Sequence, residues 1–373
     1  MQKVLFLTTA HHPKDDRIFF HQAQSLAEGQ FEVKITSLCT HLIEKNNSIE
    51  IESFSFLEKS VSEKIETFLK VCRNFQPETI ICSEPLAIFA AKKYKKEKKV
   101  TIIYDVTEWY PSMSMLREFS FLSKIFHAIK FSLINLYAGF LSDRFIFGEE
   151  TKKFPLAYFF PFKKKLILPY YPDSKFISKQ LNKIENNRIT LCYTGQISEE
   201  KGIENFFKAT DLAQKSNPEY QIKLLIIGSA RTKEDEIYFE KLLKNYSFKH
   251  IEIKQPASFE SFTESFKEAD ICFDLRALNF ENHHSLPIKL FYYIGAGKPI
   301  IYSNLKGIRQ HMNVSEFGYL VNPKDEKQIA DQILNYLQNP EKYIQHSQNA
   351  AKAFETKYNW NCIKNSFVNF IKL

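Results

Sequence analysis

Short apolar runs with β propensity alternate with longer helical patterns along almost the whole chain. This alternation is typical of parallel sheets whose strands are joined by helical crossovers, so it predicts an α/β fold. The predicted strands are Val4–Thr8, Val33–Thr36, Thr79–Cys82, Val100–Tyr104, Arg144–Phe147, Ile189–Tyr193, Lys223–Ile227, Ile251–Ile253, Ile271–Asp274 and Pro299–Tyr302. The predicted helices include Ile18–Glu28, Lys64–Asn74, Leu86–Lys95, Phe121–Leu141, Asp325–Leu337, Tyr343–Thr356 and Asn359–Ile371.

The length of 373 residues suits two domains of ordinary size better than one core. Residues 155–178 hold four prolines and little periodicity, so we interpret them as the connection, with a boundary near 170–186. We therefore predict one domain over 1–180 and a second over 181–357. A closing helix over about 358–373 is free to pack back on the first domain.

The formal net charge of +8 is concentrated in the first half of the chain, mainly in two lysine clusters at 92–99 and 163–165. Each cluster is explained equally simply as a solvated helix end or loop. The alternative is attraction to an anionic membrane or an anionic acceptor, whereas nucleic acid is disfavoured because no recognition motif accompanies the charge. The six cysteines are scattered, which favours reduced thiols and a cytoplasmic protein.

Membrane attachment is an open question at the sequence level. The N-terminus is too short and too strand-like for a signal peptide, and the longest uncharged stretch of the Phe-rich middle, 131–142, is too short to span a bilayer. The helix predicted over 121–141 is apolar around much of its circumference. It fits either a buried crossover or peripheral contact with the inner face of the cell membrane.

The most informative motif for function is Ser285-Leu-Pro-Ile-Lys-Leu-Phe-Tyr-Tyr-Ile-Gly-Ala-Gly-Lys-Pro299. Pro287 fits a first helical turn, Ser285 lies near the capping position, and Gly297 follows the end of the short helix. The unpaired amides of a helix start suit a phosphate, and Lys289 adds a full charge there. The motif predicts a diphosphate site.

A second motif, Tyr193–Gly202, follows a predicted buried strand. Gly195 allows a turn and close approach of a ligand, Ser198 caps the turn, and Lys201 can reach a diphosphate. Gly228 follows the next strand in the same way. Each segment is also compatible with an ordinary strand-turn-helix connection.

Acidic residues follow the strands of the first half: Asp16, Glu84, Asp105 and Glu108. They either gather around an acceptor or cap helices, as Asp15 or Asp16 would. The loop after the first strand contains no GxGxxG, which argues against a dinucleotide-binding dehydrogenase. No metal-ligand spacing or nucleophile elbow is present, so neither a metal nor another cofactor is expected.

Together these segments resemble the retaining GT-B glycosyltransferases of family four, also called glycosyl transferases group 1. The resemblance rests on Asp16-Arg17-Ile18, Tyr104-Asp-Val-Thr-Glu108, Tyr193-Thr-Gly195 with Glu200-Lys-Gly202, Pro287–Phe291 with Gly297–Pro299, and Trp360. It implies two Rossmann-like domains whose parallel sheets face an interdomain cleft. The second domain would bind a nucleotide sugar, and the first an acceptor.

The resemblance assigns residues to roles. Catalytic roles fall on Lys201, Lys289, Glu108 and Asp105. The nucleotide-sugar site comprises Gly195, Gln196, Gly228, Ser285, Leu286, Pro287 and Tyr292. Acceptor-side residues are Asp16, Arg17 and Glu84.

The family pattern is broken in three ways, at four positions: Gln196 replaces a frequent arginine, His284 and Tyr292 stand where two glutamates are usual, and Thr107 stands for a histidine. The expected function is transfer of a hexose from a nucleotide-diphosphate sugar to a glycan or lipid-linked acceptor with retention, in bacterial surface polysaccharide synthesis. The departures keep two alternatives open: a sugar-nucleotide epimerase or hydrolase on the same fold, and an inactive sugar-nucleotide-binding relative.

Overall fold

The computed structural model describes residues 1–46, 48–184 and 187–372, so residues 185 and 186, at the end of the predicted boundary region, lie outside it. The chain forms two compact units. The first comprises Met1–Tyr170 with Ile363–Leu373, and the second comprises Tyr171–Cys362. The division follows Tyr170 rather than residue 180, because the residues after Tyr170 pack on the second unit. The amides of Ser178 and Gln180, for example, donate to Thr263 Oγ1 and to the carbonyl oxygen of Ala296.

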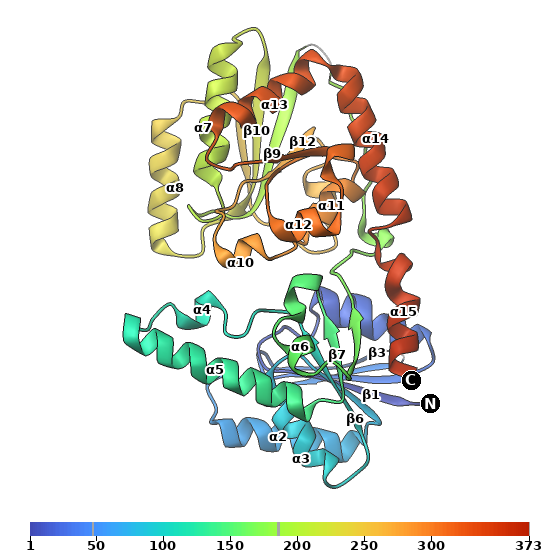
Figure 1. Cartoon of the computed structure of the whole chain (residues 1–373). Coiled ribbons are helices and arrows are strands. Elements are labelled where there is room, and N and C mark those ends of the chain that lie inside the picture. The colour runs from blue at the N-terminus through green and yellow to red at the C-terminus, as the bar shows by residue number, and fades with distance from the viewer. Residues whose placement is uncertain (47, 185–186, 373) are drawn as a thin grey trace. The chain divides into compact units, whose positions relative to one another are not determined.

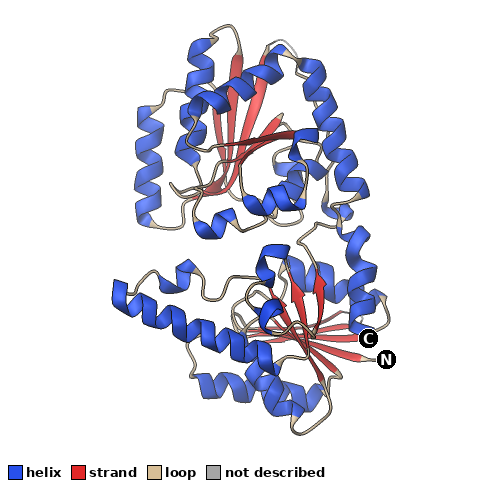
Figure 2. Cartoon of the chain, viewed as in Figure 1, coloured by secondary structure: helices blue, strands red, loops and turns tan. Residues whose placement is uncertain are grey.

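The first unit is built on one eight-stranded sheet with the order β3-β4-β2-β1-β5-β6-β7-β8, which is parallel except for the β3–β4 pair (Figures 1 and 2). Its elements are β1 (Lys3–Thr8), η1 (Asp16–Ala23), α1 (Gln24–Glu28), β2 (Glu32–Ser37), β3 (Leu42–Asn46), β4 (Ile49–Ser53), α2 (Val61–Phe75), β5 (Thr79–Cys82), α3 (Pro85–Lys95), β6 (Thr101–Val106), α4 (Met113–Leu116), α5 (Phe121–Leu141), β7 (Arg144–Phe147), η2 (Glu150–Lys153), α6 (Leu156–Phe159) and β8 (Lys164–Ile167).

The second unit is built on a six-stranded, fully parallel sheet with the order β11-β10-β9-β12-β13-β14. Its elements are η3 (Ser174–Phe176), β9 (Arg188–Gln196), α7 (Ile203–Ser216), β10 (Gln221–Ser229), α8 (Lys233–Asn245), β11 (Ile251–Lys254), α9 (Phe262–Ser265), β12 (Ile271–Asp274), α10 (Phe280–His283), α11 (Lys289–Gly295), β13 (Ile300–Ser303), α12 (Lys306–His311), η4 (Val314–Glu316), β14 (Gly318–Val321), α13 (Glu326–Gln338) and α14 (Pro340–Thr356).

The central strands are apolar because helices cover both faces of each sheet, as expected for parallel strands. In β12, all four residues are buried, and β1 is buried from Val4 to Thr8. The predicted α/β class with two parallel-sheet domains is confirmed.

The last helix, α15 (Trp360–Lys372), brings the end of the chain back to the first unit. Arg144 Nη1 donates to the carbonyl oxygen of Phe370 at 2.8 Å, and the side chains of Phe367, Phe370 and Ile371 are buried. The first unit is therefore completed by residues that follow the whole second unit in the sequence.

Four strands, β3, β4, β8 and β14, and the short helices α4 and α6 were not predicted. β4 lies beside the edge strand β3, and its buried and half-buried residues alternate. β3 is mostly exposed, β8 begins with two exposed lysines, and α6 lies in the Pro-rich segment. β14 is only four residues long. These segments lack the buried apolar run that identifies a strand in sequence, because they lie at sheet edges or in short connections.

Candidate functional site

The site in the second unit is built where β9, β10 and β12 end side by side. Gly195 pairs with Gly228 across the β9–β10 ladder. A Cβ atom on Gly228 would lie 1.9 Å from the carbonyl oxygen of Gly195, so the strands approach as only glycine permits. Gly195 has a φ of 105°, and a Cβ atom there would lie 2.9 Å from Lys289 Nζ. Both predicted glycines therefore make room at this edge.

Lys289 is the first residue of α11, and its ammonium group returns to the end of β9. Nζ donates to the carbonyl oxygen of Thr194 and lies 3.6 Å from Asp274 Oδ2. The position of α11 is fixed by a buried hydrogen bond of 2.6 Å between Thr194 Oγ1 and Tyr293 Oη. Burial lowers the pKa of Lys289, with Arg276 and Lys201 acting in the same direction against Asp274.

Asp274 and Arg276 form a bidentate ion pair at the end of β12. Arg276 Nε donates to Asp274 Oδ1 at 2.7 Å, and Nη2 donates to Oδ2. Burial of the carboxyl group would raise its pKa, but Arg276, Lys289 and Lys201 outweigh burial and hold the pKa of Asp274 at about 2. The carboxylate is therefore ionised throughout the neutral range.

Lys201 completes this group of charges. Its Nζ lies 3.6 Å from Glu200 Oε1, and its backbone N–H donates to Ser198 Oγ at 3.3 Å, so the predicted capping role of Ser198 is confirmed. Glu200 also accepts from Asn279 and Asn282, both at 3.2 Å. We call Lys201, Lys289, Asp274 and Arg276 the cationic cluster. It carries three positive charges against the buried carboxylate of Asp274 and the more exposed carboxylate of Glu200 beside Lys201, so a net positive charge remains that suits an anion.

The start of α11 differs from the prediction. The helix begins at Lys289 with Ile288 in the capping position and no side-chain cap. Ser285 instead donates its hydroxyl hydrogen to the carbonyl oxygen of Asn282 at 3.0 Å, because it closes the last turn of α10. The predicted capping role of Ser285 is therefore wrong, and Leu286 and Pro287 form the extended segment before the helix.

Tyr292 lies one turn after Lys289 and is 4% exposed. Its ring packs edge-to-face on Phe262, with ring centroids 5.3 Å apart, and on Phe259. The carbonyl oxygen of Gln196 accepts from Tyr193 Oη at 2.7 Å, which fixes the turn after β9. Asp274 and Arg276 are not among the site residues predicted from the sequence, since their pairing depends on the folded sheet.

The first unit has its own polar group at the ends of β1 and β5. Glu84 accepts from Thr8 Oγ1 at 2.8 Å and from the backbone N–H of Thr9 at 3.0 Å, instead of capping α3. His11 lies between Asp15, with Nδ1 3.7 Å from its Oδ2, and Glu84 at 4.0 Å. Sequence reasoning missed His11, whose only signal is its place after the first strand.

Charge in this group follows from burial and contact. The hydrogen bond with Asp15 is the main cause that raises the pKa of His11 to about 9, with Glu84 and Glu108 adding to it against burial. Burial and Asp15 raise the pKa of Asp16 to about 6. Asp15 accepts from the amides of Arg17 and Ile18 and so is the cap of η1. Glu108 is exposed.

Arg17 and Asp105 form a sealed pair in the first unit. Arg17 Nε and Nη2 donate to the two Asp105 carboxylate oxygens at 2.9 and 2.8 Å, and Nη1 donates to the carbonyl oxygen of Leu168. Gln22 donates to the same carboxylate, and both charged side chains are 2% exposed. With so little surface, neither residue can touch an acceptor in this structure, so we assign them a structural role.

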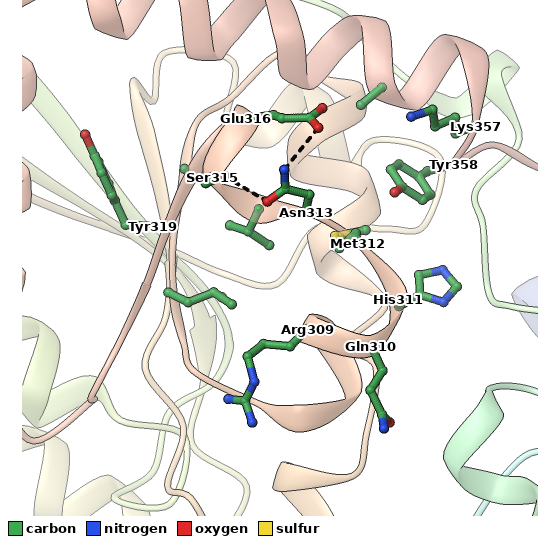
Figure 3. A pocket seen from close by; sticks show the side chains of 14 residues that line it. Arg309, Gln310, His311, Met312, Asn313, Ser315, Glu316, Tyr319, Lys357 and Tyr358 are labelled. Carbon is green, nitrogen blue, oxygen red and sulfur yellow. Dashed lines mark hydrogen bonds between the residues drawn. The ribbon is translucent and has the colours of Figure 1, made fainter.

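A separate open hollow of about 790 Å³ lies near α12, η4 and β14 (Figure 3). Arg309, Lys357 and Glu316 contribute charges to its wall, and Asn313 Nδ2 donates to Glu316 at 3.2 Å. None of the predicted site residues lines it. Among the described residues, no group of three His, Cys, Asp or Glu side chains is arranged to hold a metal ion.

Comparison with known proteins agrees with this architecture. Residues 173–353 match the family model of the glycosyl transferases group 1. The chain is similar to sucrose-phosphate synthase from Thermosynechococcus elongatus, with a TM-score of 0.78 and 16% identity over 100% of this chain and 98% of that one. It is also similar to HepE from Anabaena, solved in complex with UDP, with a TM-score of 0.70 and 12% identity over all of both chains.

A curated relative is the capsular polysaccharide biosynthesis glycosyltransferase CapM of Staphylococcus aureus, 24% identical over 209 residues, which cover 54% of this chain and 51% of CapM. The chain spans about half the length of the curated relatives it matches. The fold is that of the GT-B glycosyltransferases. The second unit carries a glycosyl transferases group 1 domain, which includes the whole cationic cluster.

Proposed function

We propose that this chain is a glycosyltransferase that moves a sugar from a nucleotide-diphosphate sugar to a glycan or lipid-linked acceptor with retention, in bacterial surface polysaccharide synthesis. The cationic cluster carries the proposal, since it gathers three positive charges inside a glycosyl transferases group 1 domain. The similarity to CapM, a capsular polysaccharide biosynthesis glycosyltransferase, supports the process, and the similarity to HepE, which binds UDP, supports the donor class.

The cluster suits a departing diphosphate. When the bond between the anomeric carbon and the diphosphate oxygen breaks, negative charge develops on that oxygen. Lys201 and Lys289 are each about one-third exposed at most, with side-chain exposures of 31% and 29%, so both can reach a ligand. Arg276 stays bound to Asp274 and adds charge from behind.

The reaction then needs only a place for one proton. As the acceptor oxygen forms the new glycosidic bond, its proton passes to the departing diphosphate on the same face of the sugar. Positioning and charge stabilisation therefore do most of the catalytic task. On the acceptor side we assign Asp16, Glu84 and Glu108 with His11, which lie together at the strand ends of the first unit.

Lysine substitution tests the proposal. Lys289→Ala and Lys201→Ala should each lower kcat/KM with a nucleotide sugar by about 10²-fold, the usual cost of one group that stabilises developing charge. Calorimetry should show weaker binding of the nucleoside diphosphate in both variants. Lys215→Ala is the matched control, because this lysine pairs with Asp211 on α7, outside the cluster.

We also propose that the lysines act without a metal, so turnover should persist in excess chelator.

Near-normal rates in both lysine variants, with thermal unfolding unchanged, would remove the assignment of the diphosphate to this cluster. Release of free sugar and nucleoside diphosphate with no acceptor dependence would instead point to hydrolysis.

A further inference from the structure

Helix α5 exposes an unusually apolar face. Eight large apolar side chains along it are between 47% and 78% exposed. They are Phe121, Leu122, Ile125, Phe126, Ile129, Leu133, Tyr137 and Phe140. In Figure 1 the N-terminal half of α5 extends past the sheet of its unit, with the short α4 beside it.

These side chains form one stripe rather than a scatter. Successive members are one, three or four residues apart, which places them on one side of the helix, since successive residues turn by about 100°. The opposite side is packed, because Asn135, Ala138 and Gly139 are buried. The first unit therefore packs one face of α5 and leaves the opposite, apolar face exposed. An exposed apolar surface of this kind marks an interaction site.

The next aromatic segment of the chain joins the same region. A Cβ atom on Gly139 would lie 2.5 Å from Leu156 Cδ2, so α6 packs against the end of α5. Lys163 Nζ donates to the carbonyl oxygens of Gly139 and Phe140 at 2.7 and 2.8 Å. Its neighbour Phe162 is 99% exposed. The stripe and Phe162 together are called the aromatic face.

The charges around the aromatic face are mostly positive, although Lys152 and Lys153 pair with Glu149 and Glu150. Segments 121–142 and 151–165 contain seven lysines and no acidic residue. Lys164 and Lys165 are exposed directly after Lys163. The charges of Lys95 and Lys92 on α3 add to burial in lowering the pKa of Lys163, so the lysines of α3 lie near this end of α5. Asp143 offsets Lys95 at 2.5 Å.

We propose that the aromatic face docks on an anionic lipid bilayer, with its apolar side chains at the acyl boundary and the flanking lysines at the headgroups. Apolar side chains beside lysines are the chemistry of helices that lie in the plane of a membrane interface. Among the described residues, no helix is both long and apolar enough to cross a membrane. The positive rim favours a bilayer over a second copy of this chain, since two such rims would repel each other.

Vesicle co-sedimentation of the full chain, without any sugar nucleotide, tests this proposal. The protein should bind vesicles of phosphatidylglycerol mixed with phosphatidylcholine, bind phosphatidylcholine alone weakly, and lose much of its binding at high salt. Because no nucleotide is present, failure here is independent of the proposed glycosyltransferase activity.

Two variants separate the apolar and charged contributions. Leu122→Ser/Phe126→Ser/Leu133→Ser should weaken binding to the anionic vesicles by at least about tenfold, since three exposed apolar side chains no longer enter the interface. Lys164→Glu/Lys165→Glu should also weaken it by at least about tenfold, since each basic group near an anionic surface contributes roughly fivefold.

Matched controls lie in the second unit. Ile237→Ser/Ile253→Ser removes exposed apolar side chains, and Lys244→Glu/Lys249→Glu reverses exposed charges. Both should bind as the parent does, and circular dichroism should show all variants folded. Equal binding to neutral vesicles, equal losses in the controls, or no vesicle binding would overturn the proposal. Light scattering that shows a dimer abolished by the triple serine variant, without vesicle binding, would assign the face to a second copy instead.

Discussion

Each unit carries an Arg–Asp pair at the end of a central strand, and the two pairs differ in what surrounds them. In the first unit, Arg17 and Asp105 are 2% exposed, and Leu168 and Gln22 use most of the remaining hydrogen-bonding capacity. In the second unit, Arg276 is 12% exposed, and Lys289 lies 3.6 Å from the same carboxylate.

The comparison shows how an Arg–Asp pair with a structural role differs from one that can take part in binding, although the two pairs have similar geometry. A buried pair with equal and opposite charges and a closed set of hydrogen bonds has nothing left to offer a ligand. A pair that is joined by two further ammonium groups leaves positive charge uncompensated at an accessible edge. The charge balance of the neighbourhood, rather than the pair itself, is the reason that we propose an anion site in the second unit and none at the pair of the first unit.

The largest expected effect concerns the sealed pair. Arg17→Ala should lower the free energy of unfolding by about 3–5 kcal/mol, because it leaves the Asp105 carboxylate buried without its counter-ion. Urea denaturation measures the loss. Arg17→Met/Asp105→Leu should recover most of it, since removing both charges leaves no unpaired group. A loss below about 1 kcal/mol in the single variant would contradict the structural role.

The corresponding change in the open pair should cost less. We expect Arg276→Ala to lower the free energy of unfolding by about 1–3 kcal/mol, because Lys289 remains close to Asp274 as a counter-ion. Binding of a nucleoside diphosphate, measured by calorimetry, should weaken at the same time. Equal stability losses for Arg17→Ala and Arg276→Ala, with unchanged ligand binding, would erase the distinction between the two pairs.

The smallest effect sharpens the comparison through pH. His11 has its pKa raised from 6.5 to about 9 in the folded chain, so its contribution to stability is fully present below pH 6.5 and is lost as the pH rises through about 9. Since the side chain is a quarter exposed, we expect His11 to contribute about 1–2 kcal/mol to the free energy of unfolding at low pH.

Unfolding of the parent and of His11→Gln should be compared across this range. The difference in stability between them should shrink towards high pH, and an NMR titration should place the imidazole transition well above its usual value. A transition near 6.5 would show that Asp15 and Glu84 do not hold the charged form.

Strong apolar periodicity made most of the fold predictable. β7, β12 and α5 have the bounds that the sequence predicts, because each combines a long apolar pattern with clear ends. Helix α6 and strands β3 and β8 were not predicted, since their stability comes from neighbours that are distant in sequence and not from a local pattern.

Residues of the candidate site could be predicted from the sequence where the residue type alone indicates the role, such as glycine for a close backbone approach or lysine for positive charge. The glycines at 195 and 228 and the lysines at 201 and 289 follow from strand ends and charge alone. The cap at Ser285 failed because α10 precedes α11 closely and takes the hydroxyl for its own last turn. The assignment of Arg17 and Asp105 to an acceptor overlooked burial, which a sequence does not show for residues 88 positions apart.

The packing of α15 on the first unit also constrains when that unit can complete its folding. Phe367 and Phe370 are translated after the whole second unit, yet these rings are buried in the unit whose β1 is translated before it. The first unit therefore cannot bury these two rings until the second unit has been translated. The hydrophobic surface that α15 covers stays exposed until then.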